Sequence, residues 1–395
     1  GFEASIDHLN PMEIESISVL KDAGTLAQLG ITGGNGVIWV TTNRGEKGKR
    51  ISVNINRGIQ EMVEKPLVTN SFQYASLYNE ALSNDKGVWT EYYTQDQLDA
   101  YKKGDTGSIK YHDLLYPDVN WYDEVLKRFA PATNANVSFS GGDDNVQYFL
   151  MVGYQNIDGL YDHTDSKRNI NSNINSQKFN YRANINARLN EVFSLTTKVG
   201  GNISDRFTPA YSTTTLWNNM MNYPANAFPV ETPKGYGGTA IYNDNPVASI
   251  LETGFAHYHY RNIQATFSLN EDLSFITKGL RFSQTLSIFN NQSQTYRKYK
   301  DYQRFAPYLA EGDTIGYRVT GTHETDFTIT QSGNSYNNLL NRINTEFALT
   351  YNQTFNQHTI GGFLVYHADK FVQAGTQVPL LTRGIIGRIQ YNYQN

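Results

Sequence analysis

From residue 51 onward, apolar and polar side chains alternate along much of the chain. In the clearest stretch, residues 179–190, every odd position is apolar or aromatic and every even position is Asn or Arg. A period of two over this length indicates a β-strand with one apolar face. The same alternation predicts about ten strands, which contain residues 51–55, 135–139, 148–154, 179–190, 193–199, 263–269, 280–288, 343–351, 360–366 and 389–393.

The connections between these predicted strands alternate in length. Short turns are expected at 141–145, 190–192, 270–272 and 352–357. Long connections are expected at 61–133, 157–168, 207–256, 291–341 and 372–384. Short turns alternating with long loops are typical of outer-membrane barrels, whereas a soluble sandwich more often turns every 8 to 12 residues or so.

The polar row of the predicted strands consists mainly of Asn, Ser, Thr, Gln and Arg. A row that faced bulk water would be richer in Lys and Glu, so this one suits a wet lumen partly filled by protein. The apolar row would then meet lipid, with Tyr and Phe at the strand ends as interfacial girdles. The pattern therefore favours an all-β transmembrane barrel of antiparallel strands, with a soluble β-sandwich or solenoid as the alternative.

The first 48 residues follow a different pattern, which predicts a small α+β segment. Asn10, Pro11 and Glu13 suit a capped helix start, and a compact β-like run follows at 17–20. Asp22 could cap a short helix over 23–29 that Gly30 ends. A glycine-rich turn at 33–36 then leads into an apolar strand, 37–42. So small a segment would be marginal alone, so we expect it to pack inside something larger.

Composition narrows the functional classes. The chain has 395 residues, no Cys and a formal net charge of −4, so thiol nucleophiles and Cys-ligated metals are excluded and nothing indicates a nucleic-acid partner. No apolar run reaches the roughly 18 residues of a membrane-spanning helix. Taken alone, 39% hydrophobic residues would indicate a soluble protein. The strands of a membrane barrel, however, also have a hydrophilic average composition, because apolar and polar residues alternate along them.

No catalytic triad order, phosphate loop or carboxylate pair stands out, so we expect no enzyme and no cofactor. The start has no signal peptide, and both ends look cut.

Two groups of motifs resemble SusC/RagA-type TonB-dependent outer-membrane transporters. Residues 16–23, 29–30 and 34–45 resemble the end of the plug domain in that family. Residues 136–142, 146–149, 153–154 and 159–161 resemble its first barrel hairpin. The resemblance implies that residues 1–48 are the C-terminal part of a plug and residues 49–395 the N-terminal part of a barrel. Such barrels have about 22 strands around a plugged lumen, so about ten strands would be part of one.

The resemblance also implies a location and a function. The protein would lie in the Gram-negative cell outer membrane, surrounded by its lipid, and import a bulky nutrient, a glycan (oligosaccharide) or a peptide. A SusD-like surface lipoprotein would cap the barrel, and the TonB complex would act on the plug through a TonB box, for which these residues offer no candidate. One alternative is a SusC-like scaffold of a larger machine that does not transport. A soluble β-rich glycan-binding protein is the other.

Aromatic residues in the long connections are the candidate contacts for a substrate or partner. They could stack on sugar rings or pack on a protein, because aromatic faces offer large rigid surfaces. The candidates are Trp89, Tyr92, Trp121, Trp217 and Tyr236. The alternative is that these residues form the loops' own small core, supported by an amphipathic helix over 71–82.

No metal site is predicted. His257 and His259 are two apart and so share one strand face, as a metal pair requires, but no third ligand is evident and the neighbouring Tyr258 and Tyr260 indicate a barrel rim. Asp143 and Asp144, and the stretch 162–165, offer oxygen atoms that could hold Ca²⁺. Solvated turns explain these acidic residues better.

Overall fold

A computed structural model describes residues 6, 9–21, 36–104, 106–162, 173–322, 324, 326, 328–332, 339–372 and 378–393. The predicted helix over 23–29 with its Gly30 stop, most of the glycine-rich turn at 33–36 and positions 163–165 of the possible Ca²⁺-binding stretch lie outside these residues.

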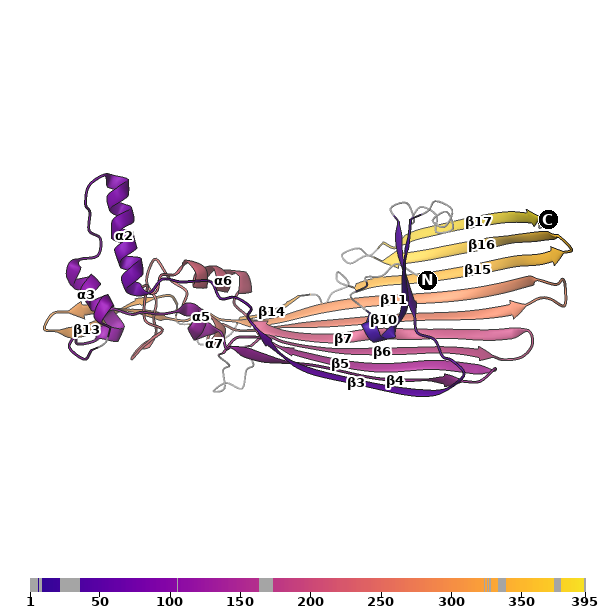
Figure 1. The fold of residues 1–395 in the computed structure, drawn as a ribbon, viewed down its shortest axis with the longest axis horizontal. Helices are drawn as coiled ribbons and strands as arrows, with labels where there is room; N and C mark the ends of the chain where they lie inside the picture. Colours follow the sequence, from indigo (N-terminus) through magenta and orange to yellow (C-terminus); the bar gives the residue numbers. More distant parts are fainter. Residues whose placement is uncertain are drawn as a thin grey trace.

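One large antiparallel sheet dominates the structure (Figure 1). Within the described residues it has 11 strands, in the order β17-β16-β15-β11-β10-β7-β6-β5-β4-β3, with β14 pairing beside that path to β11. The strands of the path are β3 (Gly48–Glu61), β4 (Phe129–Gly142), β5 (Val146–Asp158), β6 (Asn175–Arg188), β7 (Phe193–Pro209), β10 (Gly254–Asp272), β11 (Leu280–Tyr299), β15 (Leu339–Phe355), β16 (His358–Val372) and β17 (Leu380–Tyr393); β14 spans Thr328–Ser332. Each predicted strand corresponds to one strand of the path, so the period-two prediction is confirmed.

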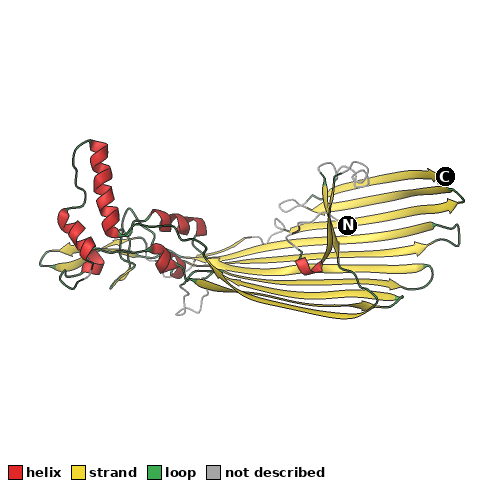
Figure 2. Cartoon of the chain, viewed as in Figure 1, coloured by secondary structure: helices red, strands yellow, loops and turns green. Residues whose placement is uncertain are grey.

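The α-helices gather beyond one end of the sheet, where the long connections emerge (Figure 2). They form, with four small strands, a unit that we call the loop module. Its elements are α2 (Ser71–Lys86), α3 (Gln95–Lys103), α4 (His112–Leu115), α5 (Trp121–Val125), α6 (Thr213–Asn222), β8 (Glu231–Thr232), β9 (Gly235–Tyr236), α7 (Pro246–Leu251), β12 (Arg304–Ala310) and β13 (Thr314–Thr320). The predicted helix over 71–82 is confirmed as the first three-quarters of α2. Among the described residues, no helix is long and apolar enough to cross a membrane.

Connections from distant parts of the sequence share one apolar core in the loop module. Its buried members are Trp121, Tyr122, Val125, Leu126, Tyr161, Leu216, Met220, Phe228, Val247 and Ile250. Trp121 packs on Phe228 with ring centroids 4.9 Å apart, and the backbone N–H of Val119 donates to the Ala225 carbonyl at 2.9 Å. The long connections are therefore folded against one another.

The two faces of the sheet differ as the alternation predicts. One face exposes a continuous apolar row across the strands, for example Val53, Leu150, Phe179, Ile263, Phe267, Leu286, Ile343 and Leu364. We call this the outer face. The opposite, inner face buries amides at Asn136, Asn180, Asn184, Asn202 and Asn262. Such an arrangement of an apolar exterior and a polar interior is that of a barrel wall in a membrane.

A short two-stranded ribbon precedes the sheet. It consists of the 3₁₀ turn η2 (Pro11–Glu13), β1 (Ile14–Leu20) and β2 (Val37–Thr42), with the two strands antiparallel. Asn10 caps η2 in a capping box with Glu13, which confirms the predicted helix start. In Figure 1 the ribbon crosses the strands of the sheet, and side-chain hydrogen bonds connect it and its N-cap residue Asn10 to the inner face.

Candidate functional site: the inner face of the sheet

The centre of the inner face is where the ribbon meets the sheet. Even-numbered residues of β6 and β7 and odd-numbered residues of β5 point to this face, as the register of the strands requires. Because the strand β6 alternates so strictly, all its Asn and Arg side chains are brought to one surface. The sequence thus supplies a polar wall opposite the ribbon.

A buried ion pair joins the ribbon to this wall. The Nε–H of Arg182 on β6 donates to Glu13 Oε2 at 2.6 Å, and the two side chains are 6% and 3% exposed. The other carboxylate oxygen, Oε1, accepts the backbone N–H of Asn10 at 2.7 Å. Glu13 therefore both closes the capping box and binds the wall. A buried pair of this kind costs several kcal/mol to break from one side, because the remaining charge is left without a partner.

Glycines make room for these polar contacts. The guanidinium of Arg182 lies over Gly200, where an added Cβ would be 2.4 Å from Arg182 Cζ. Beside it, the side-chain amide of Asn10 donates to Asn136 Oδ1 at 2.8 Å, and a Cβ on Gly153 would lie 2.5 Å from that same oxygen. Close approach of ribbon and wall thus depends on residues without side chains.

A second set of contacts fixes the end of β2. Asn184 donates its side-chain amide to the Asn43 carbonyl at 2.7 Å and to Thr42 Oγ1 at 3.1 Å. Within the described residues, Asn180 Oδ1, Asn184 Oδ1, Asn262 Nδ2 and Asn291 Oδ1 are buried without a hydrogen-bond partner. Water is the partner that buried amides of this kind normally find, which fits a wet interior.

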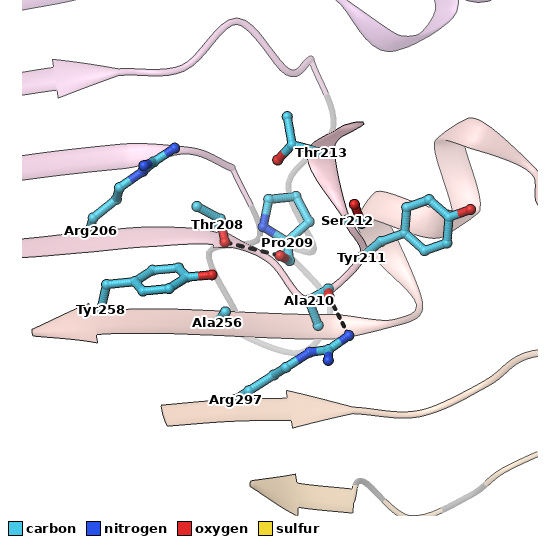
Figure 3. A pocket seen from close by; sticks show the side chains of 10 residues that line it. All are labelled: Arg206, Thr208, Pro209, Ala210, Tyr211, Ser212, Thr213, Ala256, Tyr258 and Arg297. Carbon is cyan, nitrogen blue, oxygen red and sulfur yellow. Dashed lines mark hydrogen bonds between the residues drawn. The ribbon is translucent and has the colours of Figure 1, made fainter. Parts of the chain in front are cut away.

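A pocket opens on the inner face at the end next to the loop module (Figure 3). It has a volume of about 350 Å³ and is lined by Arg206, Thr208, Pro209, Ala210, Tyr211, Ser212, Thr213, Ala256, Tyr258 and Arg297. The side chains of Arg206 and Arg297 enter it from different strands, with Tyr258 between them in the view of Figure 3. Arg297 Nη2 also donates to the Ala210 carbonyl at 2.7 Å, so its guanidinium is oriented by the backbone.

The rim of this pocket is held by a hydrogen bond in the loop module. The Tyr211 hydroxyl donates to Asp244 Oδ2 at 2.7 Å. Burial, reinforced by the Asp244 carboxylate, raises the pKa of the Tyr211 hydroxyl well above its usual range. Tyr211 is therefore a neutral hydrogen-bonding group, and the positive charge of the pocket comes from its two arginines.

The five aromatic candidates fall in different environments. Trp89 and Tyr92 lie on the surface of the loop module, with 67% and 62% of their side chains exposed. Trp121 is 2% exposed in the core of the module, so the alternative interpretation, a core of the loops themselves, describes it better. Trp217 and Tyr236 pack against that core and are partly buried. The structure therefore separates one exposed pair from three core or core-edge residues.

The ribbon-to-wall contacts are absent from the candidates chosen by sequence. Glu13 could be assigned only as a capping residue, and Arg182 only as one member of a polar row. The contact joins residues that are 169 positions apart in the sequence. A periodic pattern along one strand does not show which residues of a distant segment that strand contacts. The signal available was that Arg182 is one of two charged residues, with Arg188, in a row otherwise composed of amides.

Comparisons with known proteins agree with one another. No family model matches the chain. The TonB-dependent receptor SusC of Bacteroides thetaiotaomicron is 28% identical over 221 residues, covering 54% of this chain and 20% of SusC. The TonB-dependent receptor P26 of Formosa agariphila is 27% identical over 195 residues, covering 48% of this chain and 17% of the receptor. The chain therefore spans less than a third of the length of these curated relatives.

The fold comparison covers the whole chain. The RagAB peptide importer in its closed-closed state superposes with a TM-score of 0.65 and 17% identity, over 100% of this chain and 46% of the importer chain. The comparisons confirm the resemblance to SusC/RagA-type transporters, the partial-barrel fold and the outer-membrane location. The relatives named here are receptors and importers, which fits the expectation that the chain is not an enzyme.

Proposed function

We propose, from the sequence and fold that it shares with SusC/RagA-type TonB-dependent transporters, that this chain is the plug-to-barrel part of an outer-membrane importer of bulky nutrients. Residues 1–48 would be the C-terminal part of the plug and residues 49–395 the N-terminal part of the barrel. The observation that carries the proposal is the buried Glu13–Arg182 pair at 2.6 Å, which ties the ribbon to the inner wall. A plug held to its wall by a few polar contacts can close a wide pore and still be released.

Energy for that release would come from the TonB complex acting on the plug. The contacts between ribbon and wall are hydrogen bonds and an ion pair, and water can replace such bonds when the plug moves. An apolar interface of the same size would lose its hydrophobic stabilisation with nothing in exchange. The polar contact surface therefore supports a plug that moves.

We infer that the substrate carries acidic groups, and we favour a peptide over a neutral oligosaccharide. The inner-face pocket presents Arg206 and Arg297, and guanidinium groups bind carboxylates in a bidentate, directional way. Tyr258 adds an aromatic face beside them. A peptide offers both a terminal carboxylate and side chains that pack on such a ring.

The test is uptake of labelled peptides by cells that carry the full-length receptor. We expect uptake to require the receptor and a working TonB complex, and Arg206→Gln to reduce uptake of peptides with free carboxylates about tenfold, the loss of roughly one charge-assisted bond. Peptides with amidated ends and no acidic residues serve as the matched control and should be affected less. Equal uptake with and without the receptor, or a full-length protein that stays in solution without detergent, would contradict the proposal.

A SusD-like surface lipoprotein would cap the barrel by contacting the loop module. Trp89 and Tyr92 are exposed there, and large aromatic side chains commonly anchor protein interfaces. We expect Trp89→Ala to weaken co-purification of the lipoprotein. Phe275, which is 72% exposed in the turn after β10 at the opposite end of the sheet, provides the control Phe275→Ala. If both variants retain the lipoprotein equally, another surface binds it.

A further inference from the structure

A third side chain joins the two histidines that the sequence singled out. Asp205 on β7 lies opposite His259 on β10 in the strand register, and His257 lies opposite Phe207. Asp205 Oδ1 is 2.8 Å from His257 Nε2 and 2.5 Å from His259 Nδ1. One potential ligand atom from each of the three residues lies within 4.8 Å of the other two. The structure thus supplies the third group that the sequence could not reveal.

The cluster sits on the outer face of the sheet, near the end from which the loop module emerges. His257 and His259 share the odd-numbered face of β10 with Ile263 and Phe267, which are exposed apolar residues. Both histidines lie within five residues of Gly254, where β10 begins. The apolar band of such a barrel is only about 25 Å tall, whereas a 19-residue strand extends about 60 Å. The three side chains therefore lie toward the loop-side edge of the lipid-facing band.

The three residues are accessible without being fully solvated. The side chains of His257, His259 and Asp205 are 29%, 24% and 31% exposed. The His257 ring stacks on Phe207 at 4.2 Å with the ring planes 7° apart, which fixes its orientation. Two imidazoles and one carboxylate that are held by adjacent strands form a ligand set of the type that Zn²⁺ uses when it keeps an open fourth position.

We propose that Asp205, His257 and His259 bind one divalent transition-metal ion, such as Zn²⁺, on the outer surface of the barrel wall, with His257 Nε2 and His259 Nδ1 as the nitrogen ligands. Metal–ligand distances of about 2.0 to 2.1 Å in a tetrahedron put neighbouring ligand atoms about 3.3 Å apart. The two nitrogen–oxygen distances must therefore widen by less than 1 Å or so, which side-chain rotation on a strand allows.

Arg261 affects the affinity of the proposed site for the metal ion. Its Nε–H donates to His259 Nε2 at 2.7 Å, so in this arrangement the His259 proton is on Nδ1, pointing at Asp205. A metal on Nδ1 moves that proton to Nε2, where the N–H would face the N–H of Arg261. Arg261 must then swing away into solvent. Replacing it by a residue with an acceptor oxygen would support the metal-bound form, as second-shell acceptors do for ligating histidines.

The alternative is that the cluster is a hydrogen-bonded His–Asp–His group that binds nothing. The two interpretations differ in the effect of Arg261→Gln. Loss of the arginine removes one hydrogen bond from a metal-free cluster. At a metal site the same change removes an opposing donor and adds an acceptor, so it should increase affinity.

The test is Zn²⁺ titration of the purified full-length receptor in detergent, after stripping with a chelator, followed by calorimetry and by thermal unfolding. We expect the wild type to bind one more Zn²⁺ than the double variant Asp205→Asn/His257→Gln, and to gain thermal stability that the variant does not gain, since a ligand that binds only the folded state stabilises it. Co²⁺ in place of Zn²⁺ should give a visible absorption band that the variant lacks.

Two single variants complete the experiment. Arg261→Gln should tighten the extra site about tenfold. His358→Gln, which alters an exposed histidine bonded to Tyr391 at the other end of the sheet, should leave it unchanged. The same Zn²⁺ count in the wild type and the double variant would overturn the proposal, as would weaker binding by Arg261→Gln. Because that variant is expected to gain affinity, misfolding cannot imitate the predicted result.

Discussion

At the scale of single residues, Glu13 connects local structure to the whole fold. One of its carboxylate oxygens completes a helix cap three residues away, and the other binds Arg182 on the barrel wall. A capping residue of this kind would ordinarily be judged a local matter of about 1 kcal/mol. Here its substitution leaves a buried guanidinium unpaired, at a cost of about 3 to 5 kcal/mol.

Glu13→Ala should therefore loosen the ribbon from the wall while the sheet stays intact. We expect increased leakage through the full-length receptor, measured as sensitivity of the cells to a large antibiotic that the closed pore excludes. A matched pair of apolar replacements, Glu13→Leu with Arg182→Met, removes both charges and should restore most of the barrier, because neither charge is then buried alone. Leakage from the double variant equal to that of Glu13→Ala would show that the ion pair is not what holds the ribbon.

Residue pairs of this type also mark the limit of what the sequence could predict. His257 and His259 could be recognised as a pair on one strand face, because residues two positions apart in a strand point to the same side. Asp205 could not, because its position beside His259 depends on the register between β7 and β10 across a 44-residue connection that holds α6 and α7. Glu13 and Arg182 escaped prediction for the same reason.

At the scale of elements, the strands could be predicted and the loop module could not. Alternation located each strand of the sheet path because burial on one face only imposes a period of two. The strands proved longer than the predicted stretches, as in β10, which extends beyond 263–269 to Gly254–Asp272. In the long connections only α2 was foreseen, since α5 and α7 are too short for a period to emerge and their partners come from other connections.

The loop module should respond to core substitutions as a folded unit. Trp121→Ala removes a ring that is 2% exposed, and we expect it to destabilise the module by about 3 to 5 kcal/mol. Limited proteolysis of whole cells is the measurement, because the module should then be cut while the barrel strands remain protected. Ile241→Ala, which alters a residue that is 82% exposed on the surface of the same module, is the control and should leave the cleavage pattern unchanged. Identical patterns for the two variants would mean that the connections do not fold around a common core.

At the scale of the whole molecule, the two faces of the sheet meet different solvents. The outer face exposes an apolar row across its strands, and the inner face buries amides against the ribbon. The mean hydropathy of the chain conceals this division, because the apolar side chains of the outer face and the polar side chains of the inner face offset each other in the average. A membrane wall therefore follows from the order of the residues and not from their composition.

Substitution of adjacent residues on β10 tests this division. Ile263, at the midpoint of β10, points to the outer face, and Gln264 points to the inner face. We expect Ile263→Lys to reduce assembly of the full-length receptor by about 2 to 4 kcal/mol, the cost of a lysine that faces lipid near the middle of the bilayer, whereas Gln264→Lys should assemble normally. The fraction that shows heat-dependent mobility on gels measures assembly. Equal assembly of the two variants would mean that lipid does not contact the outer face.

The position of Glu13 in the chain has a mechanical consequence. Asn10 and Glu13 precede β1, and β1 with β2 follows behind them. Tension applied to the chain before residue 10 would reach the two wall contacts in series before it reached the hydrogen bonds of the ribbon. These two contacts would therefore break first. Their strength would set the force at which the hydrogen bonds between β1 and β2 begin to break.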